Sequence, residues 1–320
     1  MAKAIFTFSK INSMQPVCKR CGAGAEIYLD YARVSLCPDC FKNLFERKVK
    51  ETVLKYKMIE RGDRVAVAAS GGKDSSALLS VLRRIFPDIE LAALHINLGI
   101  DGYSDECERK LTELTGRLDV DLKVFSLKKE LGFSMGDFKR TVYGDRICAP
   151  CGTIKRYLIN KLAHEGGFTK LATGHNLDDI AEVLFNCYLQ GDVNQIAKLR
   201  PVLLSAHPKL VCKIKPLWAM TEMEDLLYAS YSGLPFRAKE CPFSRGTRSL
   251  ERKRLINDIS VRIPGFKHTF VKSHLKKLSP LIEKSIGEAP LVECEVCGMP
   301  SSSKVCAFCR RVQLVKSENY

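Results

Sequence analysis

The chain has 320 residues, 46% of them hydrophobic, which is enough for a packed core and about two domains. It contains no run of about 18 apolar residues and its start lacks the apolar core of a secretory signal, so we expect a cytoplasmic protein without a membrane partner. The formal net charge of +15 favours a polyanionic partner, and the 14 cysteines favour metal binding or catalysis over disulfides.

A cysteine module opens the chain, in an expected domain of residues 1–45. Its ligands have the spacing C-x2-C-x15-C-x2-C and are Cys18, Cys21, Cys37 and Cys40. Two such pairs bring four thiolates into a tetrahedron, which suits zinc, whereas free core cysteines would not explain the paired spacing. Four protein ligands leave no open position, so we expect a structural zinc ion.

Strand-like and helix-like segments alternate through an expected catalytic domain of residues 46–236. The expected strands are 64–69, 89–96, 120–127 and 169–175, and the expected helices are 74–86, 103–118, 150–165 and 178–190. This order predicts an α/β fold with a parallel sheet, helices on both faces and a ligand site at the carboxyl ends of the strands. Beyond about residue 200 the strand signal fades and basic, helix-like segments take over.

The first expected strand runs into the turn SGGKDSS at residues 70–76. Small residues let backbone N–H groups approach a ligand, and the following helix adds partial positive charge, so the turn predicts a phosphate site. It is not a Walker A loop, because Asp74 follows the Gly-Lys pair. Asp74 would repel phosphates unless a divalent cation lay between them, so we infer Mg²⁺. A simple helix cap by Asp74 or Ser75 is the alternative.

Three cysteines remain for a further site. Cys148 and Cys151 form a C-x-x-C in the middle of the chain, and Cys241 lies before a proline among basic residues. Three thiolates can hold a [4Fe-4S] cluster and leave one iron without a protein ligand. The alternatives are a redox disulfide between the first two cysteines, with a persulfide route through Cys148 or Cys241 without iron as its variant, and a third zinc site. The other cysteines fall in apolar or helical patterns and are expected to pack: Cys107, Cys187 and Cys212.

Lys155 follows Cys151 by four residues, so a helix would present both on one face. We assign Lys155 to neutralising phosphate charge in the transition state. A generic exposed lysine is the alternative.

Basic residues concentrate in 237–277, where twelve Lys and Arg stand against three acidic residues and carry nine of the fifteen net charges. We expect a basic helical extension over 237–288 that grips a polyanion, with a solvated charged face as the alternative. A second module, in an expected domain of residues 289–320, has the spacing C-x2-C-x8-C-x2-C and predicts a second zinc ion. Its ligands are Cys294, Cys297, Cys306 and Cys309.

The stretch ASGGKDS at residues 69–75 resembles the PP-loop of ATP pyrophosphatases, which release pyrophosphate from ATP and leave AMP on a substrate oxygen. The resemblance extends to HIN at 95–97 and TGHNLDD at 173–179. Together with both cysteine modules and the central cysteines, nearly the whole chain resembles the TtuA and NcsA group of tRNA 2-thiolation enzymes.

This resemblance implies an ATP site with adenine against the backbone at Ile96. The implied nucleotide-site residues are Ala69, Ser70, Gly71, Gly72, Asp74, Ser75, Ile96, Lys155, Gly174 and Asp179. Asp179 would position the nucleotide or Mg²⁺, with a helix cap as its alternative role. The implied cluster ligands are Cys148, Cys151 and Cys241, and the implied catalytic residues are Asp74, Lys155, Cys148 and Cys241.

The implied reaction is ATP-dependent tRNA 2-thiolation, in which O2 of a uridine is adenylated and replaced by sulfur delivered via the [4Fe-4S] cluster. The implied partners are tRNA, a ubiquitin-like sulfur carrier or free sulfide, and a second copy in a homodimer. TtcA-like cytidine thiolation, a PP-loop amidotransferase and a zinc-ribbon RNA-binding protein without thiolation activity are the alternatives. The residues do not distinguish a wobble uridine from a T-loop uridine.

Overall fold

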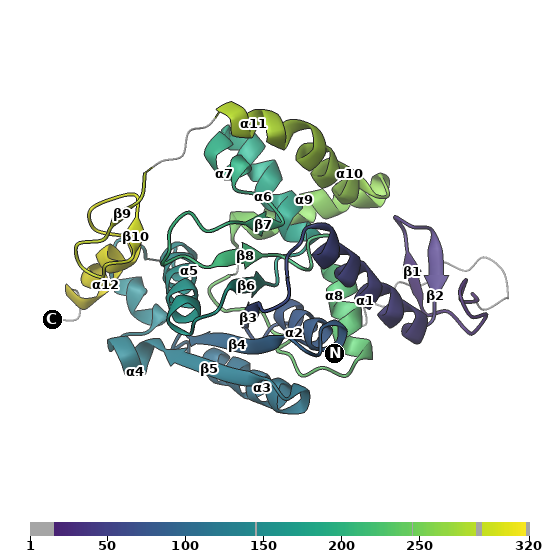
Figure 1. Ribbon diagram of the computed structural model, residues 1–320, viewed down its shortest axis with the longest axis horizontal. Coiled ribbons are helices and arrows are strands. Elements are labelled where there is room, and N and C mark those ends of the chain that lie inside the picture. The colour runs from purple at the N-terminus through teal and green to yellow at the C-terminus, as the bar shows by residue number, and fades with distance from the viewer. Residues whose placement is uncertain (1–15, 145, 245, 286–289, 318–320) are drawn as a thin grey trace.

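The computed structural model describes residues 16–144, 146–244, 246–285 and 290–317. The start of the chain and the expected boundary at 288–289 lie outside these ranges. A six-stranded sheet forms the centre, in the order β5-β4-β3-β6-β8-β7 (Figure 1). Its strands are β3 (Arg64–Ala68), β4 (Glu90–Asn97), β5 (Asp121–Ser126), β6 (Lys170–Thr173), β7 (Val202–Leu203) and β8 (Cys212–Ile214).

The sheet confirms the expected α/β class, and it extends further than the sequence indicated. β3 pairs in parallel with β4 and β6, β4 with β5, and β6 with β8. β7 pairs with β8 in the antiparallel direction, so the sheet is mixed at this edge. The expectation that strands end near residue 200 was therefore wrong. β7 and β8 have only two and three residues, too few for a periodic pattern to reveal.

Helices cover both faces of the sheet. Val65 and Val67 of β3 join the core with α1 (Pro38–Lys55), α2 (Lys73–Ile85), α3 (Tyr103–Leu118) and α8 (Glu222–Tyr231). Ala66 of β3 and Leu94 of β4 lie in a separate core with Ala163 of α5 (Cys148–Glu165). Successive strand residues point to opposite faces, and here both faces are buried, which explains the nearly continuous apolar run in β3.

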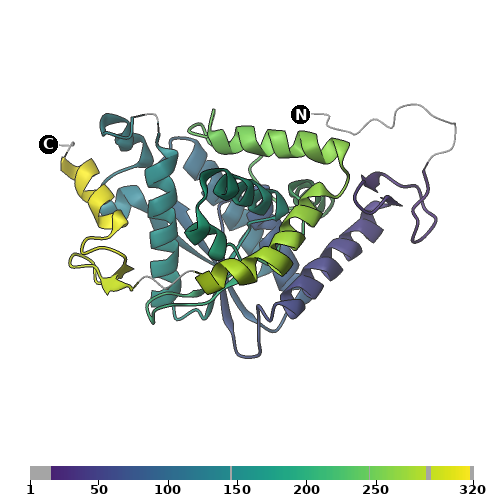
Figure 2. The same cartoon turned by 90° about the horizontal axis from the view of Figure 1, so that it is seen from above.

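A second helical group lies above the sheet edge that ends in β7 (Figures 1 and 2). It consists of α6 (Leu177–Gln190), α7 (Val193–Ala197), α9 (Arg248–Arg262), α10 (Phe266–Ser273), the π-helical turn η2 (His274–Leu278) and α11 (Ser279–Ser285). Leu184, Trp218, Ile256 and Val271 form its core. Two short elements follow β5, namely α4 (Leu127–Leu131) and η1 (Met135–Arg140).

The two cysteine modules sit at opposite ends of the molecule (Figure 1). The first contains the hairpin of β1 (Ile27–Leu29) and β2 (Val34–Leu36), and Cys37 is the N-cap of α1. The second contains β9 (Val292–Glu293), β10 (Pro300–Ser301) and α12 (Ala307–Ser317). Phe308 of α12 stacks on Tyr157 of α5 with ring centroids 3.8 Å apart, so this module docks on the sheet-covering helix.

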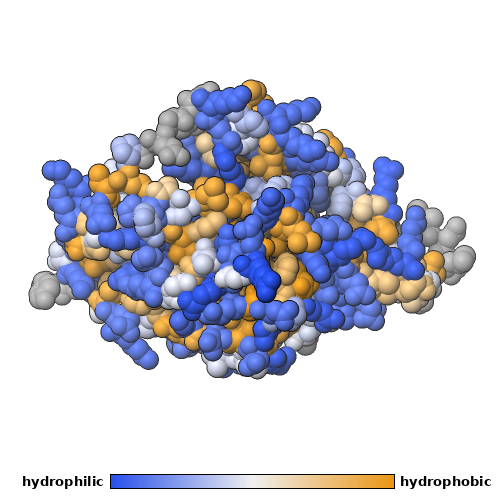
Figure 3. All heavy atoms as spheres, viewed as in Figure 1, coloured by the Kyte–Doolittle hydropathy of each residue, from blue (hydrophilic) through white to orange (hydrophobic). Residues whose placement is uncertain are grey.

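Hydrophilic side chains cover much of the face in Figure 3, with hydrophobic ones showing between them. No helix in the described ranges combines the length and apolar character needed to cross a membrane.

A buried ion pair joins the first module's helix to α8. Glu224 of α8 has a side chain only 1% exposed, and Lys48 of α1 contacts it at 2.9 Å. Tyr31 donates a second hydrogen bond to the same carboxylate, at 2.7 Å. Burial favours a raised pKa for Glu224, but Lys48 and the hydrogen bonds outweigh burial and lower it. Because this pKa is lowered on folding, the pair stabilises the fold near pH 7, and that contribution disappears as the pH falls through the lowered pKa.

We expect Lys48→Met to lower the free energy of unfolding by about 3 kcal/mol at pH 7, because it leaves a buried charge without its partner. Lys42→Met is the matched control, since Lys42 of the same helix pairs with Asp39, whose side chain is 84% exposed. The control should lose less than about 1 kcal/mol. Urea unfolding measures both, and equal losses would contradict a structural role for the Lys48 pair.

Candidate functional site

The turn after β3 requires glycine at residue 71. Gly71 has φ +78°, and a Cβ atom there would lie 2.9 Å from the backbone of Cys107. Its carbonyl oxygen accepts a hydrogen bond of 2.8 Å from the backbone N–H of Arg237. A side chain at Gly71 would therefore strain the turn and push α3 away from it.

The hydroxyl groups of the turn organise its backbone. Ser75 Oγ accepts from the N–H of Ser70 at 3.2 Å and donates to the carbonyl of Gly72 at 3.1 Å. Gly72 is the N-cap of α2, and no side chain caps it. The alternative in which Asp74 or Ser75 serves as a helix cap is therefore not observed. The first N–H groups of α2 remain available to an anion, as the phosphate prediction requires.

A second turn, after β6, packs directly against the first. A Cβ atom on Gly174 would lie 3.3 Å from the backbone of Asp74. Asn176 caps α6 by accepting from the N–H groups of Asp178 and Asp179, at 3.1 and 3.2 Å. The carboxylate of Asp179 accepts a hydrogen bond of 3.2 Å from the backbone N–H of Asn176, which completes a capping box. Asp179 thus has the capping role raised as an alternative, and its other oxygen contacts Lys253 at 2.5 Å.

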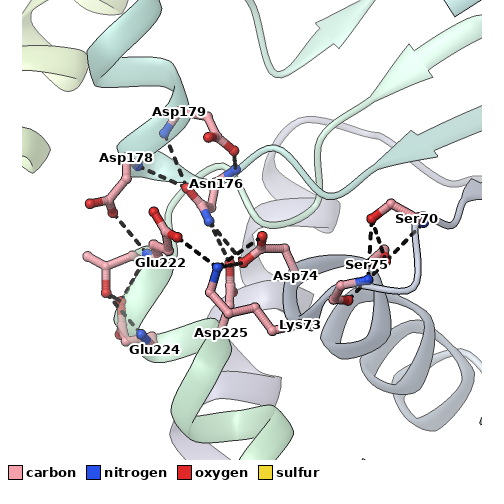
Figure 4. Close-up of polar contacts among 12 residues, drawn as sticks. Ser70, Lys73, Asp74, Ser75, Asn176, Asp178, Asp179, Glu222, Glu224 and Asp225 are labelled. Atoms are coloured by element: carbon pink, nitrogen blue, oxygen red, sulfur yellow. Dashed lines mark hydrogen bonds and ion pairs between the residues drawn. The ribbon is translucent and has the colours of Figure 1, made fainter. Parts of the chain in front are cut away.

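Carboxylates from three parts of the chain meet beside these turns (Figure 4). Asn176 donates to Asp225 at 2.9 Å and to Asp74 at 3.4 Å. Lys73 contacts Glu222 at 2.7 Å and Asp74 at 3.3 Å. These contacts hold the turn after β3, the start of α6 and the first turn of α8 together.

The charges in this cluster only partly cancel. Burial raises the pKa of Asp74, Lys73 opposes this, and Asp179 reinforces it. Burial also raises the pKa of Asp225, and the charge of Asp74 adds to the effect. For Glu222, Lys253 and Lys73 outweigh burial and lower the pKa to about 2. Oxygen ligands in excess of nearby cations are what Mg²⁺ prefers, so these residues fit the inferred ion.

The end of β4 lies beside the start of the first turn. The N–H of Ala69 donates to the carbonyl of Leu94 at 2.9 Å, and the imidazole Nδ1 of His95 contacts the carbonyl oxygen of Ala69, also at 2.9 Å. Ile96 is buried and follows at the same edge. The structure therefore brings Ala69 and Ile96, both predicted from the resemblance, to one edge of the sheet.

The three remaining cysteines share one neighbourhood. α5 begins at Cys148, two residues earlier than expected, so both cysteines of the C-x-x-C lie in its first turn. The thiol of Cys148 donates to the carbonyl of Phe243 at 3.2 Å, two residues beyond Cys241. Burial raises the pKa of Cys148 and of Cys151, and nearby Cys241 reinforces both shifts while Lys155 opposes them.

Sulfur separations distinguish these cysteines from the terminal modules. A tetrahedron of Zn–S bonds of about 2.3 Å has edges of about 3.8 Å. The modules match this, with sulfur–sulfur distances of 3.6 Å for Cys21–Cys37 and 3.9 Å for Cys294–Cys309. Within the described residues, only the two terminal groups bring their ligand atoms within 4.8 Å of one another. The wider spacing of the central cysteines suits a four-iron cluster better than a single zinc ion.

Lys155 is exposed and makes no hydrogen bond or ion pair with the described residues. Its charge acts on Cys148 and Cys151 and also on His175, which adjoins Gly174. Lys155 therefore lies between the cysteines and the turn after β6, where it can meet a bound anion.

A short strap joins the phosphate turn to the third cysteine. Arg237 bonds to Gly71 through its backbone, and Cys241 follows four residues later. The guanidinium of Arg237 pairs with Glu106 at 3.0 Å and lies 4.1 Å from the ring centroid of Tyr103. The Arg237 end of this strap is thus fixed beside the phosphate turn, and just beyond its other end the carbonyl of Phe243 accepts from Cys148. The sequence did not reveal this role for Arg237.

The basic segment divides into two sets. Arg252 pairs with Glu182 at 2.6 Å, Lys253 pairs with Asp179 and Glu222, and Lys267 pairs with Asp178. The count of basic residues did not reveal that these three cations pair with carboxylates of the protein itself, which makes them less available to a polyanion. The exposed cations available to a polyanion include Arg254, Arg262, Lys272, Lys276 and Lys277.

Asn176, Glu222 and Asp225 were not among the predicted site residues. Asn176 lies within the stretch at 173–179 that carried the resemblance. The signal for α8 is the capping box of Thr221 and Glu224, a pattern that predicts a helix start close to Glu222 and Asp225.

Residues 42–259 match the PP-loop domain family. The chain is 40% identical over 303 residues to the tRNA-5-methyluridine(54) 2-sulfurtransferase of Pyrococcus horikoshii, covering 95% of this chain and 96% of that protein. It is 37% identical to the protein of the same name from Thermus thermophilus, covering 92% and 90%. The solved structure of the U34-tRNA thiolase NcsA from Methanococcus maripaludis with its [4Fe-4S] cluster is similar with a TM-score of 0.78 and 29% identity, covering 93% of this chain and 95% of that one.

We expect Gly71→Ala to lower the free energy of unfolding by about 1–3 kcal/mol, because a side chain there meets both a left-handed backbone and the backbone of Cys107. Gly72→Ala is the matched control: Gly72 has φ −89°, and its added Cβ would approach only Ser70 Oγ, at 3.5 Å. The control should lose less than about 1 kcal/mol. Chemical denaturation without nucleotide measures both, and equal stability would contradict the close approach at Gly71.

Proposed function

The chain belongs to the PP-loop family of tRNA 2-thiolation sulfurtransferases, and from this membership we propose that it uses ATP to adenylate O2 of a tRNA uridine and then exchanges that oxygen for sulfur. The observation that carries the proposal is the strap of residues 237–241. Its Arg237 bonds to Gly71 of the phosphate turn, and its Cys241 belongs to the cysteine site. The intact turn argues against a zinc-ribbon RNA-binding protein without activity. TtcA-like cytidine thiolation has less support, because the similar proteins are named for uridine.

The two turns at the carboxyl edge would bind ATP. The N–H groups of residues 70–75 would hold its phosphates, with Ser75 fixing the turn and Gly174 allowing close approach. Adenine would lie against the backbone at Ile96, beside Ala69. Asp74 and Asp179 would face Mg²⁺, which when bound neutralises phosphate charge.

In the first step, O2 of the uridine attacks the α-phosphorus of ATP, and the bond to the pyrophosphate oxygen breaks. Lys155 would neutralise charge that develops on the phosphates, a role supported by its exposure and by the lack of a partner among the described residues. The adenylated oxygen is then a good leaving group. In the second step a sulfur nucleophile adds at C2, and the C2–O2 bond breaks with departure of AMP.

Cys148, Cys151 and Cys241 would hold the [4Fe-4S] cluster. When bound by three thiolates, such a cluster has one iron without a protein ligand, which supplies a place for sulfur. The start of α5 orients two of the thiols, and the strap carries the third. The two terminal modules, within the proposed domains 1–45 and 289–320, would each hold a structural zinc ion.

We propose a T-loop uridine at position 54 as the target. Three relatives named for that position are 40%, 37% and 32% identical to the chain, whereas the structure named for U34 is 29% identical. The extension over 237–288 would contact the tRNA backbone through its exposed cations. The sulfur would come from a ubiquitin-like carrier or free sulfide, and mapping of thiolated positions in tRNA by mass spectrometry tests the target.

We expect Asp74→Asn to reduce thiolation by about 100-fold or more, because it removes the charge that positions Mg²⁺ at the phosphates. Its tRNA affinity should stay within about twofold, since the exposed cations are unchanged. Asp119→Asn, at a fully exposed carboxylate beyond the site, is the control for both assays. Loss of tRNA binding by Asp74→Asn would instead make the turn part of the RNA surface.

Anaerobically purified protein should contain about four irons and two zincs per chain. Replacing Cys148, Cys151 or Cys241 by Ser should abolish iron binding and leave both zincs, because the terminal modules share no ligand with this site. Cys107→Ser should keep the iron, although Cys107 lies beside the strap. Metal analysis and visible absorption report the result. An active, colourless protein with a third zinc would overturn the cluster assignment.

A further inference from the structure

A cavity of about 270 Å³ opens on the helical group formed by α6, α9, α10 and η2, away from the two turns. Its lining includes Tyr188, Ile263, Phe266, Phe270, His274 and Leu278. None of these residues takes part in the proposed ATP, cluster or zinc sites. Ile263 is 56% exposed and Leu278 is 44% exposed, so an apolar lining is open to solvent.

Aromatic rings form much of the cavity wall. Phe266 and Phe270 lie nearly parallel, at an interplanar angle of 11° and a centroid distance of 5.6 Å. Tyr188 lies 6.2 Å from Phe270, and His274 stands edge-on to Tyr188 at 5.9 Å. A flat ring that enters the cavity can therefore stack on one ring and contact another edge-on.

His274 supplies a polar group without a partner. Its side chain is 2% exposed, and Tyr188 Oη lies 2.9 Å from its Nδ1. Its Nε2 is buried and has no hydrogen-bond partner among the described residues. Leaving such an atom unsatisfied costs about 1–3 kcal/mol, and because it has no solvent-accessible surface it does not itself face the open cavity. His274 also begins the π-helical turn η2, and such turns are frequent at binding sites.

Positive charge dominates the chain around the cavity and favours a polyanion, because Glu283, which acts on His274, is already paired with Arg200. From residue 259 to residue 282 the chain has no Asp or Glu, and it carries Arg262, Lys267, Lys272, Lys276 and Lys277. Lys267 is engaged with Asp178, and the other four are exposed. An apolar side chain of a protein partner would use the lining but would leave these cations unmatched.

We propose that this cavity receives an unstacked nucleobase of the bound tRNA, other than the uridine that reacts. The base would stack on Phe270, while the exposed cations contact its flanking phosphates. The inference rests on the proposed function for the identity of the RNA.

α6 would connect this site to the reaction site. It carries Asp179 near its start and Tyr188 near its end, nine residues later. At about 1.5 Å per residue, the two positions are about 14 Å apart along one helix. A base held in the cavity would therefore fix the tRNA at a set distance from the ATP site.

The first test fills the cavity with Ser273→Trp, at an exposed lining residue that lies outside the proposed reaction site. We expect tRNA affinity to fall about 5- to 150-fold, which is the range for one lost base–aromatic contact. The slope of log affinity against log salt should not change, because the phosphate contacts remain. Val261→Trp is the matched control: it adds the same ring at a position 79% exposed outside the lining, and it should bind as the wild type does.

Phe270→Leu is the second variant, because it keeps an apolar side chain and removes the ring. It should weaken tRNA binding in the same direction with an unchanged salt slope and unchanged metal content. Wild-type affinity in both Ser273→Trp and Phe270→Leu would overturn the proposal. A changed molecular mass in solution with unchanged tRNA affinity would also overturn it, and would assign the cavity to a contact between copies of the chain.

Failure of the proposed reaction would be seen separately. A wild-type protein that binds tRNA, loses affinity on Ser273→Trp and thiolates no position would overturn the reaction and leave the nucleobase site supported. A wild-type protein that does not bind tRNA would overturn both.

Discussion

Mutual repulsion among clustered carboxylates, one buried and three partly buried, is the constraint on which the rest of the site depends. Asp74, Asp179, Glu222 and Asp225 meet at the carboxyl edge of the sheet, although they come from α2, α6 and α8. Lys73 and Lys253 each bridge two of these carboxylates, and Asn176 donates to two of them. Such a cluster is stable only where cations and amide donors are held in place, so the turns and helices around it must keep their mutual positions.

α8 connects the carboxylate cluster to the first cysteine module through its contacts with α1. Glu222 at its start faces the lysines of the site, whereas Glu224 is buried against Lys48 of α1. α1 begins at the second cysteine pair of the first module. The first module is therefore linked to the carboxylate cluster through two helices, so a metal ion bound by its four cysteines would have a structural role far from its own ligands.

The strap from Arg237 to Cys241 connects the phosphate turn to the third cysteine. A phosphate-binding turn alone would serve many reactions, and cysteines alone would serve many metals. The bond between Arg237 and Gly71 places the third cysteine near α5, whose first turn carries the other two. In the proposed reaction, this arrangement would bring sulfur chemistry and nucleotide chemistry to one substrate atom, with Lys155 between them.

The sequence by itself determined the features whose residues lie close together in the chain. Paired cysteines at turn spacing identified both modules, the small residues at 70–72 indicated the phosphate turn, and short apolar runs between helix-like segments located four strands of the sheet. Only the tertiary structure decided which distant charges meet. The inward pairing of Arg252 and Lys253, the strap at Arg237 and the carboxylates of α8 depend on contacts between residues far apart in the chain. β7 and β8 were hidden for a related reason: strands of two and three residues are stabilised by their neighbours in the sheet and have too few residues to show a pattern of their own.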